Sequence, residues 1–501
     1  ETYSVSSKLW NGLGEQIITK LQNNMKEPWF YYLHLYDLHL LSYPKEYRLQ
    51  NGPKEISDEK FGINQYERVI SAIDPWLKKI LEQVDLQNTI VVITSDHGTE
   101  VASYSGDLEN YNDKNIESRL HNPGTVFNIA QKISNSIPKN MFPGKKKFSK
   151  LYTDRTRSNL KKKMLPKLDE IDKNISEYEK RLMRTSVWGD SFVYDDRFRI
   201  PLLILGPKIP SNKKIKQQVR SIDIFPTIFE IAELNKKSLG HGKSLLPLIQ
   251  NNPYEELPAF LEGAANSPKF VNKNIIGIRT SEFKYFRDKY DSAIEIHLYD
   301  LKNDPLEEKN IAKNNSFIVK KMEEMLIKLQ NDHGFKYEKT EQILDIDEEK
   351  KIEQELRKLG YMWINFYVKL INKIIWWSIS SENTVNLIFI MIDGARLDRI
   401  VTGKNYSNLI SNSAFFPKTI TYAPYTIAAL HAVFSGSYGH KTGVDSYWST
   451  PKFKKEEYKT LSLYLQQNGY YTHADVINDL VLPKIGFDSF VVHDEENDDL
   501  T

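Results

Sequence analysis

The stretch Val385–Gly394 reads VNLIFIMIDG, a nearly unbroken apolar run that ends directly in a carboxylate and a glycine. Short apolar runs without alternation are typical of strands covered on both faces, as in a parallel sheet. Three further runs share this character: Trp29–Tyr36 (WFYYLHLY), Thr89–Thr94 (TIVVIT) and Ile200–Gly206 (IPLLILG). Helical patterns such as Gln65–Val84 and Lys459–Gln467 lie between them. This alternation predicts a doubly wound α/β fold with a mostly parallel sheet and helices on both faces.

The composition excludes several classes of protein. The chain has 501 residues, of which 40% are hydrophobic and 27% charged, and this excludes a disordered chain, a collagen and a coiled-coil rod. It has no cysteine, so a disulfide framework, a zinc–thiolate site and a cysteine nucleophile are excluded. With 68 basic and 66 acidic residues the net charge is +2, which predicts no binding to nucleic acid.

Polar residues follow three of the apolar runs. Asp393 follows the first, Asp96 and His97 follow the run at 89–94, and Asp37 and His39 follow the run at 29–36. Function in open α/β sheets gathers where strands end. A carboxylate there is costly to bury unless it binds a cation, and an Asp-His pair offers half of a metal site. The alternative is that each Asp caps a turn.

The segment Ala423–Val444 reads APYTIAALHAVFSGSYGHKTGV. It predicts a helix of small residues that begins near Thr426. Free backbone N–H groups and the helix dipole at such a start stabilise an anion next to the hydroxyl. The alternative is that Thr426 is only the helix N-cap.

Together these segments resemble the sulfatase branch of the alkaline phosphatase superfamily. VNLIFIMIDGARLDR resembles the first strand with its metal-binding Asp, and APYTIAALHAVFSGSYGHKTGV resembles the nucleophile helix. PWFYYLHLYDLH resembles a strand carrying a late His, and ITSDHG resembles the second metal-binding strand. Other matching landmarks are LQQNGYYTH, IGFDSF, FVYDDRFRIPLLILGP, VRSIDIFPTIFEI, GKSLLPLI, IRTSEFKYF, LYDLKNDPLEEKNIA and RKLGYM. The resemblance implies the superfamily sheet with a smaller C-terminal subdomain.

The order of these landmarks is unusual. Residues 1–360 resemble the later part of the family domain, with an insertion at 105–187 and a tail subdomain at about 255–360. Residues 385–501 resemble the first part, and 361–384 is predicted to be an amphipathic linker. The chain is therefore either circularly permuted or a fragment that spans two tandem copies. We expect the two pieces to close on each other, because each alone would expose sheet edges.

The resemblance assigns roles to individual residues. The nucleophile position falls on Thr426, which cannot be oxidised to formylglycine, whereas phosphatase relatives use Thr directly. Asp393, Asp96, His97 and Thr426 match the ligands of one divalent metal, and His39 matches a His that acts on the leaving group or the substrate oxyanion. Gly394 replaces a second Asp, which favours Mn, Zn or Mg over Ca, and a second metal stays undetermined.

The predicted function is therefore metal-dependent hydrolysis or transfer of phosphate esters, on a small molecule or a glycan. Two alternatives stay open: a sulfuric ester hydrolase, and an inactive interaction module. Three positions depart from the family or add to it, and each is a candidate for a second metal or a substrate contact: Asp37, Asn478 and Asp190. The family's Arg position falls on Leu430, and His241 is interpreted as a surface His.

Targeting signals give two further expectations. The first thirty residues lack an apolar run of signal-peptide type, which predicts a cytoplasmic protein. Residues 361–379 are interrupted by Lys369 and Lys373, so they predict no transmembrane span. This segment is either a surface helix or a weak contact with a membrane surface through its Trp and Tyr residues.

Overall fold

The computed structural model describes residues 8–23, 25–42, 45–99, 176–188, 193–234, 240–263, 274–331, 385–446 and 449–493. Within these ranges eight strands form one large sheet, in the order β15-β14-β1-β11-β2-β4-β12-β5. The strands are β1 (Trp29–Leu35), β2 (Thr89–Thr94), β4 (Leu202–Leu205), β5 (Lys213–Lys214), β11 (Asn386–Ile392), β12 (Ala414–Phe415), β14 (Tyr471–Val476) and β15 (Ser489–Val492). The sheet is mostly parallel, although β4 runs antiparallel to both β2 and β12.

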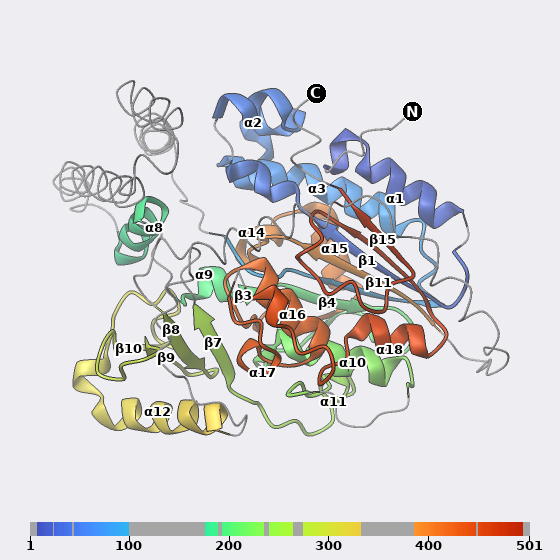
Figure 1. Ribbon diagram of the computed structural model, residues 1–501. Helices are drawn as coiled ribbons and strands as arrows, with labels where there is room; N and C mark the ends of the chain where they lie inside the picture. The colour runs from blue at the N-terminus through green and yellow to red at the C-terminus, as the bar shows by residue number, and fades with distance from the viewer. Residues whose placement is uncertain are drawn as a thin grey trace, which may run out of the picture.

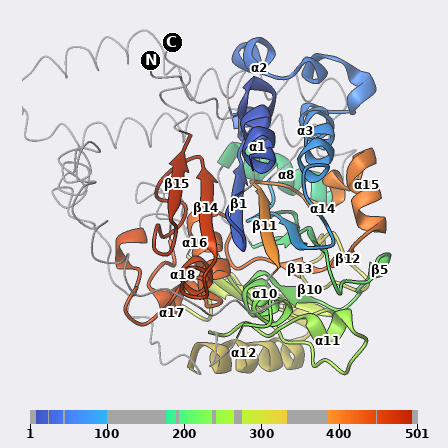
Figure 2. The same ribbon diagram turned by 90° about the vertical axis from the view of Figure 1, so that its right-hand side faces the viewer.

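Strand β11 lies at the centre of this sheet, between β1 and β2 (Figures 1 and 2). It pairs in parallel with both, so that Tyr32 lies opposite Phe389 and Phe389 lies opposite Val92. The segments on either side of residues 361–384 therefore share one sheet, as we expected. The predicted boundaries of the two pieces and of the tail subdomain stay predictions.

Helices cover both faces of the large sheet, because its side chains alternate between two apolar cores (Figure 1). In β11, Phe389 and Met391 face one core and Ile388 and Ile390 face the other. The first core is closed by α10 (Ile224–Ile231), α16 (Thr426–Ser435) and α18 (Leu461–Gln467). The second is closed by α1 (Leu13–Gln22), α3 (Gln65–Leu81) and α15 (Lys404–Ser411). Helices α3 and α18 lie within the predicted helical patterns and are slightly shorter.

Two smaller sheets and further helices complete the described chain. An antiparallel sheet in the order β10-β9-β8-β7 packs against α12, and a three-stranded sheet has the order β3-β13-β6. The strands are β3 (Arg199–Ile200), β6 (Val219–Arg220), β7 (Ala259–Gly263), β8 (Ile275–Arg279), β9 (Phe283–Asp288), β10 (His297–Asp300) and β13 (Thr419–Ile420). The remaining helices are α2 (Lys45–Asn51), α8 (Glu177–Trp188), α9 (Asp195–Phe198), α11 (Leu246–Ile249), α12 (Ser316–Asn331), α14 (Leu397–Ile400) and α17 (Gly439–Thr442).

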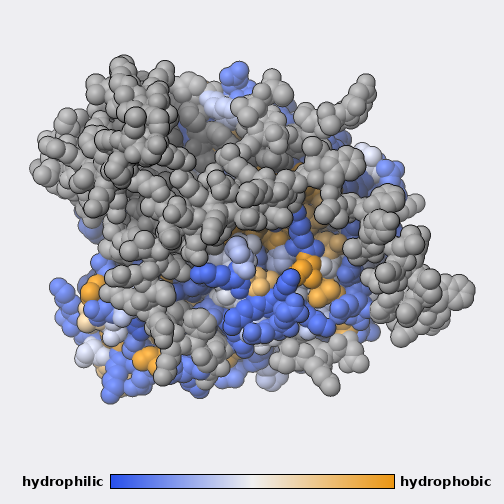
Figure 3. Space-filling model, viewed as in Figure 1, coloured by the Kyte–Doolittle hydropathy of each residue, from blue (hydrophilic) through white to orange (hydrophobic). Residues whose placement is uncertain are grey.

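Several predicted segments lie outside the described residues. They are most of the insertion at 105–187, the charged stretch 335–360 and the linker 361–384. On the face drawn in Figure 3, the described surface is mainly hydrophilic, with small separate apolar patches. Among the helices of the described chain, none combines the length and apolarity that crossing a bilayer requires.

Candidate active site

Three neighbouring strands bring polar side chains to the same edge and the same face of the large sheet. His34 of β1, Met391 of β11 and Thr94 of β2 lie level with one another in the parallel register. Asp393 and Asp96 each lie two residues further along, so they point to the same face as Met391 and Thr94. That face is the one covered by α16, which places all three polar side chains beside the start of that helix.

Asp96 has one oxygen fixed by the protein and one without a hydrogen bond. Its Oδ1 accepts the backbone N–H groups of His97 at 2.8 Å and Gly394 at 3.1 Å. Its Oδ2 is buried and has no hydrogen-bond partner among the described residues. Asp393 is likewise buried, and its Oδ2 lies 3.2 Å from His34 Nε2. Both carboxylates are therefore oriented with an oxygen toward a common point.

His34, Asp96 and Asp393 form a group that could hold a divalent metal ion. Their ligand atoms lie within 4.8 Å of one another, and all three side chains are buried. Neither ring nitrogen of His34 forms a hydrogen bond with a described residue, because its contact with Asp393 lacks the required alignment. Buried polar groups almost always have a partner, so these unpaired atoms fit a cation at this point. Imidazole and carboxylate are common ligands of Zn²⁺ and Mn²⁺.

The charges at the site favour an ionised Asp393. Burial by itself raises the pKa of this carboxyl group, but the imidazoles of His34, His97 and His39 outweigh burial and hold the pKa well below its usual value. Burial also raises the pKa of Tyr32 far above that of an ordinary tyrosine, and the charges of Asp96 and Asp393 raise it further. The site therefore keeps Asp393 charged and Tyr32 neutral.

Thr426 lies at this point as the first residue of α16. The N-cap of the helix is Tyr425, so the interpretation of Thr426 as a simple N-cap does not hold. Its hydroxyl donates to Asp393 Oδ2 at 3.2 Å and lies 3.3 Å from His97 Nε2. His97 Nδ1 lies 2.9 Å from the carbonyl oxygen of Gly98, which only accepts hydrogen bonds. Nδ1 therefore carries a proton, while Nε2 faces the Thr426 hydroxyl and lies 3.3 Å from Asp96 Oδ2.

The loop after Asp393 is held by three side chains. The N–H of Gly394 donates to Asp96, that of Ala395 donates to Ser95 Oγ at 3.0 Å, and that of Arg396 donates to the Tyr66 hydroxyl at 2.8 Å. The Tyr66 hydroxyl in turn donates to the carbonyl oxygen of Gly394 at 2.9 Å. Every backbone N–H in this short turn is thus satisfied, which fixes the direction of the Asp393 side chain.

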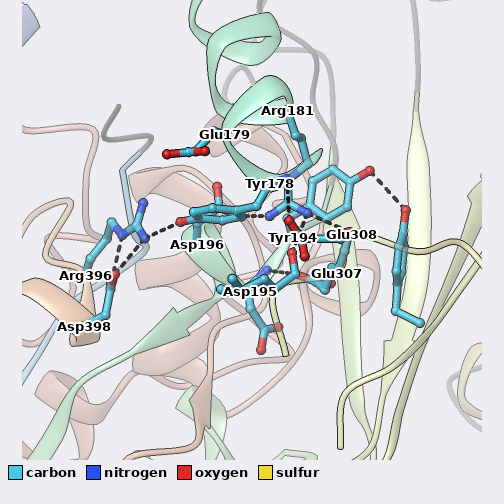
Figure 4. Close-up of polar contacts among 12 residues, drawn as sticks. Tyr178, Glu179, Arg181, Tyr194, Asp195, Asp196, Glu307, Glu308, Arg396 and Asp398 are labelled. Atoms are coloured by element: carbon cyan, nitrogen blue, oxygen red, sulfur yellow. Dashed lines mark hydrogen bonds and ion pairs between the residues drawn. The ribbon is translucent and has the colours of Figure 1, made fainter. Parts of the chain in front are cut away.

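Helix α8 braces the same loop from outside. The guanidinium of Arg396 donates to Asp398 and to the hydroxyl of Tyr178 on α8, each at 2.8 Å (Figure 4). Arg181 of α8 donates to Asp196 at 2.9 Å, and the carbonyl oxygen of the neighbouring residue 197 accepts the N–H of Gly98. The helix therefore contacts both the loop that follows Asp393 and the chain that packs beside His97.

The other predicted residues are placed differently. His39 stacks on Tyr36 with ring centroids 4.0 Å apart and lies near enough to Asp393 to contribute to its lowered pKa. Asp37 accepts the N–H of Leu9 at 2.8 Å. Burial raises the pKa of Asp37 to about 6, and the group of possible metal ligands found among the described residues does not include it. Asn478 is exposed and only accepts the N–H of Leu480 within a turn, so the structure does not bring it into the site.

Asp190 and His241 are the two remaining predicted positions. Asp190 lies outside the described residues. His241 is half-buried, stacks on Tyr438 and lies 3.2 Å from Lys441 Nζ, so it is not simply a surface residue. The functional residue that sequence reasoning missed is His34. Its signal is an ionisable side chain within an otherwise apolar buried strand.

The fold and the site define a class of protein. A mostly parallel sheet with helices on both faces carries two strand-end carboxylates that meet a hydroxyl at a helix start. This is the architecture of an α/β protein of the alkaline phosphatase superfamily.

Comparisons with known proteins narrow this class. The Sulfatase family matches residues 4–157, and the family described as N-sulphoglucosamine sulphohydrolase, C-terminal, matches residues 185–332. Arylsulfatase K of Mus musculus is 29% identical over 163 residues, which cover 30% of this chain and 28% of the relative. Arylsulfatase K of Bos taurus is 31% identical over 137 residues, which cover 24% and 23%.

Two solved structures align over smaller parts. One is a protein in complex with its substrate D-glucosamine-2-N,6-O-disulfate. It is 28% identical, the alignment covers 28% of this chain and 30% of that chain, and the TM-score is 0.24. The other is the phosphonate monoester hydrolase of Agrobacterium radiobacter. It is 25% identical, the alignment covers 30% of this chain and 33% of that chain, and the TM-score is 0.26. The fold assignment rests on the sheet topology described above and not on these partial alignments.

Residues 4–157 and 185–332 therefore resemble sulfatases. The chain spans about a quarter of the length of the curated relatives it matches. Both matched family segments precede β11, so Asp393 and helix α16 with Thr426 lie outside them. The comparisons favour sulfate esters over the phosphate esters that we expected from Thr426.

Proposed function

We propose that the protein is a metal-dependent hydrolase of sulfate esters. The observation that supports this proposal is the meeting of Asp393, Asp96, His34 and the Thr426 hydroxyl at one sheet edge, in a chain that resembles arylsulfatases. His34, Asp96 and Asp393 would hold one divalent ion, Mn, Zn or Mg rather than Ca, with a second metal undetermined. When bound, such an ion neutralises negative charge on the ester oxygens.

Thr426 is the proposed nucleophile. Its Oγ forms a bond to sulfur while the bond between sulfur and the leaving oxygen breaks, and its proton passes to His97 Nε2 at 3.3 Å. The first backbone N–H groups of α16 point toward the same place and stabilise the negative oxygens. Water then hydrolyses the ester on Thr426. His39 is the proposed proton donor to the leaving oxygen.

A phosphate ester is the second candidate substrate, and the identity of residue 426 favours it. Threonine cannot become the formylglycine that sulfatases of this family use, whereas a hydroxyl serves directly as a nucleophile in phosphoryl transfer. Leu430 adds no cation at the position where sulfatases carry an Arg. These features leave the choice between the two esters to experiment.

A paired assay tests both candidates. The full chain is stripped with a chelator, reloaded with Mn²⁺, Zn²⁺ or Mg²⁺, and assayed on nitrophenyl sulfate and nitrophenyl phosphate. We expect metal-dependent turnover that Thr426→Ala reduces by roughly 10³-fold or more, while Thr402→Ala, at an exposed threonine, leaves it unchanged. Faster turnover of the phosphate would favour the second candidate. No turnover of either ester by the metal-loaded protein would favour an inactive interaction module.

A further inference from the structure

Residue 394 has no carboxylate, and its surroundings do not admit one. Gly394 has a φ of +69°, a left-handed backbone conformation that L side chains rarely adopt. A Cβ atom built there would lie 2.4 Å from Thr99 Oγ1. The backbone at residue 394 therefore favours glycine, and this residue supplies no ligand atom beside the paired carboxylates.

His34 approaches the paired carboxylates from the neighbouring strand. It lies on the same face of β1 as Phe30 and Tyr32, which both pack into the core under α16. Its side chain is fully buried, its Nε2 lies 3.2 Å from Asp393 Oδ2, and neither ring nitrogen has a hydrogen-bond partner in the described chain. An imidazole in the middle of an apolar strand, with both nitrogens unpaired, is costly unless a further group binds there.

One ring nitrogen of His97 already has a hydrogen-bond partner in the protein. Its Nδ1 donates to the carbonyl of Gly98, and its Nε2 faces the Thr426 hydroxyl. It is also more exposed than His34, with 15% of its side chain accessible compared with none. His97 Nε2 also lies near both carboxylates, 3.3 Å from Asp96 Oδ2 and 3.8 Å from Asp393 Oδ1. It shares that place with the Thr426 hydroxyl, whereas His34 is fully buried and has a ligand atom within 4.8 Å of both carboxylates.

We infer that His34 is a nitrogen ligand of the metal, in a site to which residue 394 supplies no carboxylate. This inference rests on the proposed metal-dependent function, and it adds a reason for the metal preference. Replacing a hard oxygen ligand by an imidazole lowers the preference for Ca²⁺ and favours Mn²⁺ or Zn²⁺. The strand that carries His34 thereby sets the selectivity of the site.

The test measures metal binding rather than turnover. Chelator-treated full-length protein is titrated calorimetrically with Mn²⁺, Zn²⁺ and Ca²⁺, and the Mn²⁺-loaded protein is examined by pulsed EPR for coupling to nitrogen. We expect nitrogen coupling in the unaltered protein and affinity for Mn²⁺ and Zn²⁺ about 10- to 100-fold lower in His34→Gln. The matched control His431→Gln alters a buried histidine that is absent from the metal group, and it should bind as the unaltered protein does.

A second variant covers the case in which glutamine disturbs the strand. His34→Asp restores an oxygen ligand, so we expect it to bind metal, to lose the His34 nitrogen coupling and to gain relative affinity for Ca²⁺. Unchanged nitrogen coupling and unchanged affinities in both folded variants would overturn the inference. Nitrogen coupling that depends on His34 in a protein without turnover would support the ligand assignment while contradicting the proposed function.

Discussion

Replacing Tyr66 by Phe should destabilise the loop that carries Asp393. The hydroxyl of Tyr66 both donates to the carbonyl of Gly394 and accepts the N–H of Arg396, at 2.9 and 2.8 Å, and all of these groups are buried. Tyr66→Phe leaves a buried C=O and a buried N–H unpaired. At about 1–3 kcal/mol for each of the two unpaired groups, the free energy of unfolding should fall by about 2–6 kcal/mol.

The assay is urea unfolding, followed by fluorescence and compared at equal m-values. Tyr406 supplies a matched control, because it is equally buried and its hydroxyl has no hydrogen-bond partner among the described residues. Tyr406→Phe should therefore leave the free energy of unfolding unchanged or raise it slightly. Tyr66→Phe should also weaken metal binding by about 10- to 100-fold, because Tyr66 supports a ligand. If the two variants unfold at the same urea concentration, the reasoning about this loop is wrong.

Two further predictions concern stability. Gly394→Ala should lower the free energy of unfolding by about 2–4 kcal/mol, because the strain of a left-handed backbone adds to the close contact with Thr99. Gly469 is also left-handed but has nothing within 4 Å of a built Cβ, so Gly469→Ala should show the backbone strain alone. Equal shifts of the urea midpoint in the two variants would refute a contribution from the Thr99 contact. Burial lowers the pKa of His431 to about 4, so between its unfolded value of roughly 6.5 and pH 4 the unfolded state binds the extra proton. The free energy of unfolding should therefore fall by about 3 kcal/mol as the pH drops from roughly 6.5 to 4, and it should not depend on this group above that range. The urea midpoint of His431→Leu, measured across the same pH range, should lack this decrease.

The strand-end residues could be predicted from sequence because parallel strands bring their carboxyl ends to one edge. Asp393, Asp96 and Thr426 meet for this reason, although they are far apart in the chain. His34 could not be chosen in the same way, since it lies inside a strand and not after it. Its parity with Phe30 and Tyr32 does predict its face, but only the packing shows that its nitrogens lack partners.

Residues in turns were less predictable. Asn478 was chosen because it is polar and close in sequence to a strand end, but the turn directs it to solvent, where it binds the N–H of Leu480. Asp37 comes two residues after the end of β1, just as Asp96 comes two residues after the end of β2, but Asp37 instead accepts the N–H of Leu9. Periodicity sets the faces of strands, whereas local hydrogen bonds decide where each connecting residue points.

The central place of β11 has a consequence for synthesis at the ribosome. Trp29 and Asn386 contact each other across a sequence separation of 357 residues. The strands on either side of β11 emerge first and wait while roughly 290 further residues are made, which takes tens of seconds at typical rates of translation. During that time two apolar strands have no neighbour between them, and such edges invite pairing with other chains. Production of this protein should therefore depend on chaperones that hold nascent chains, and slower growth at low temperature should raise the soluble yield.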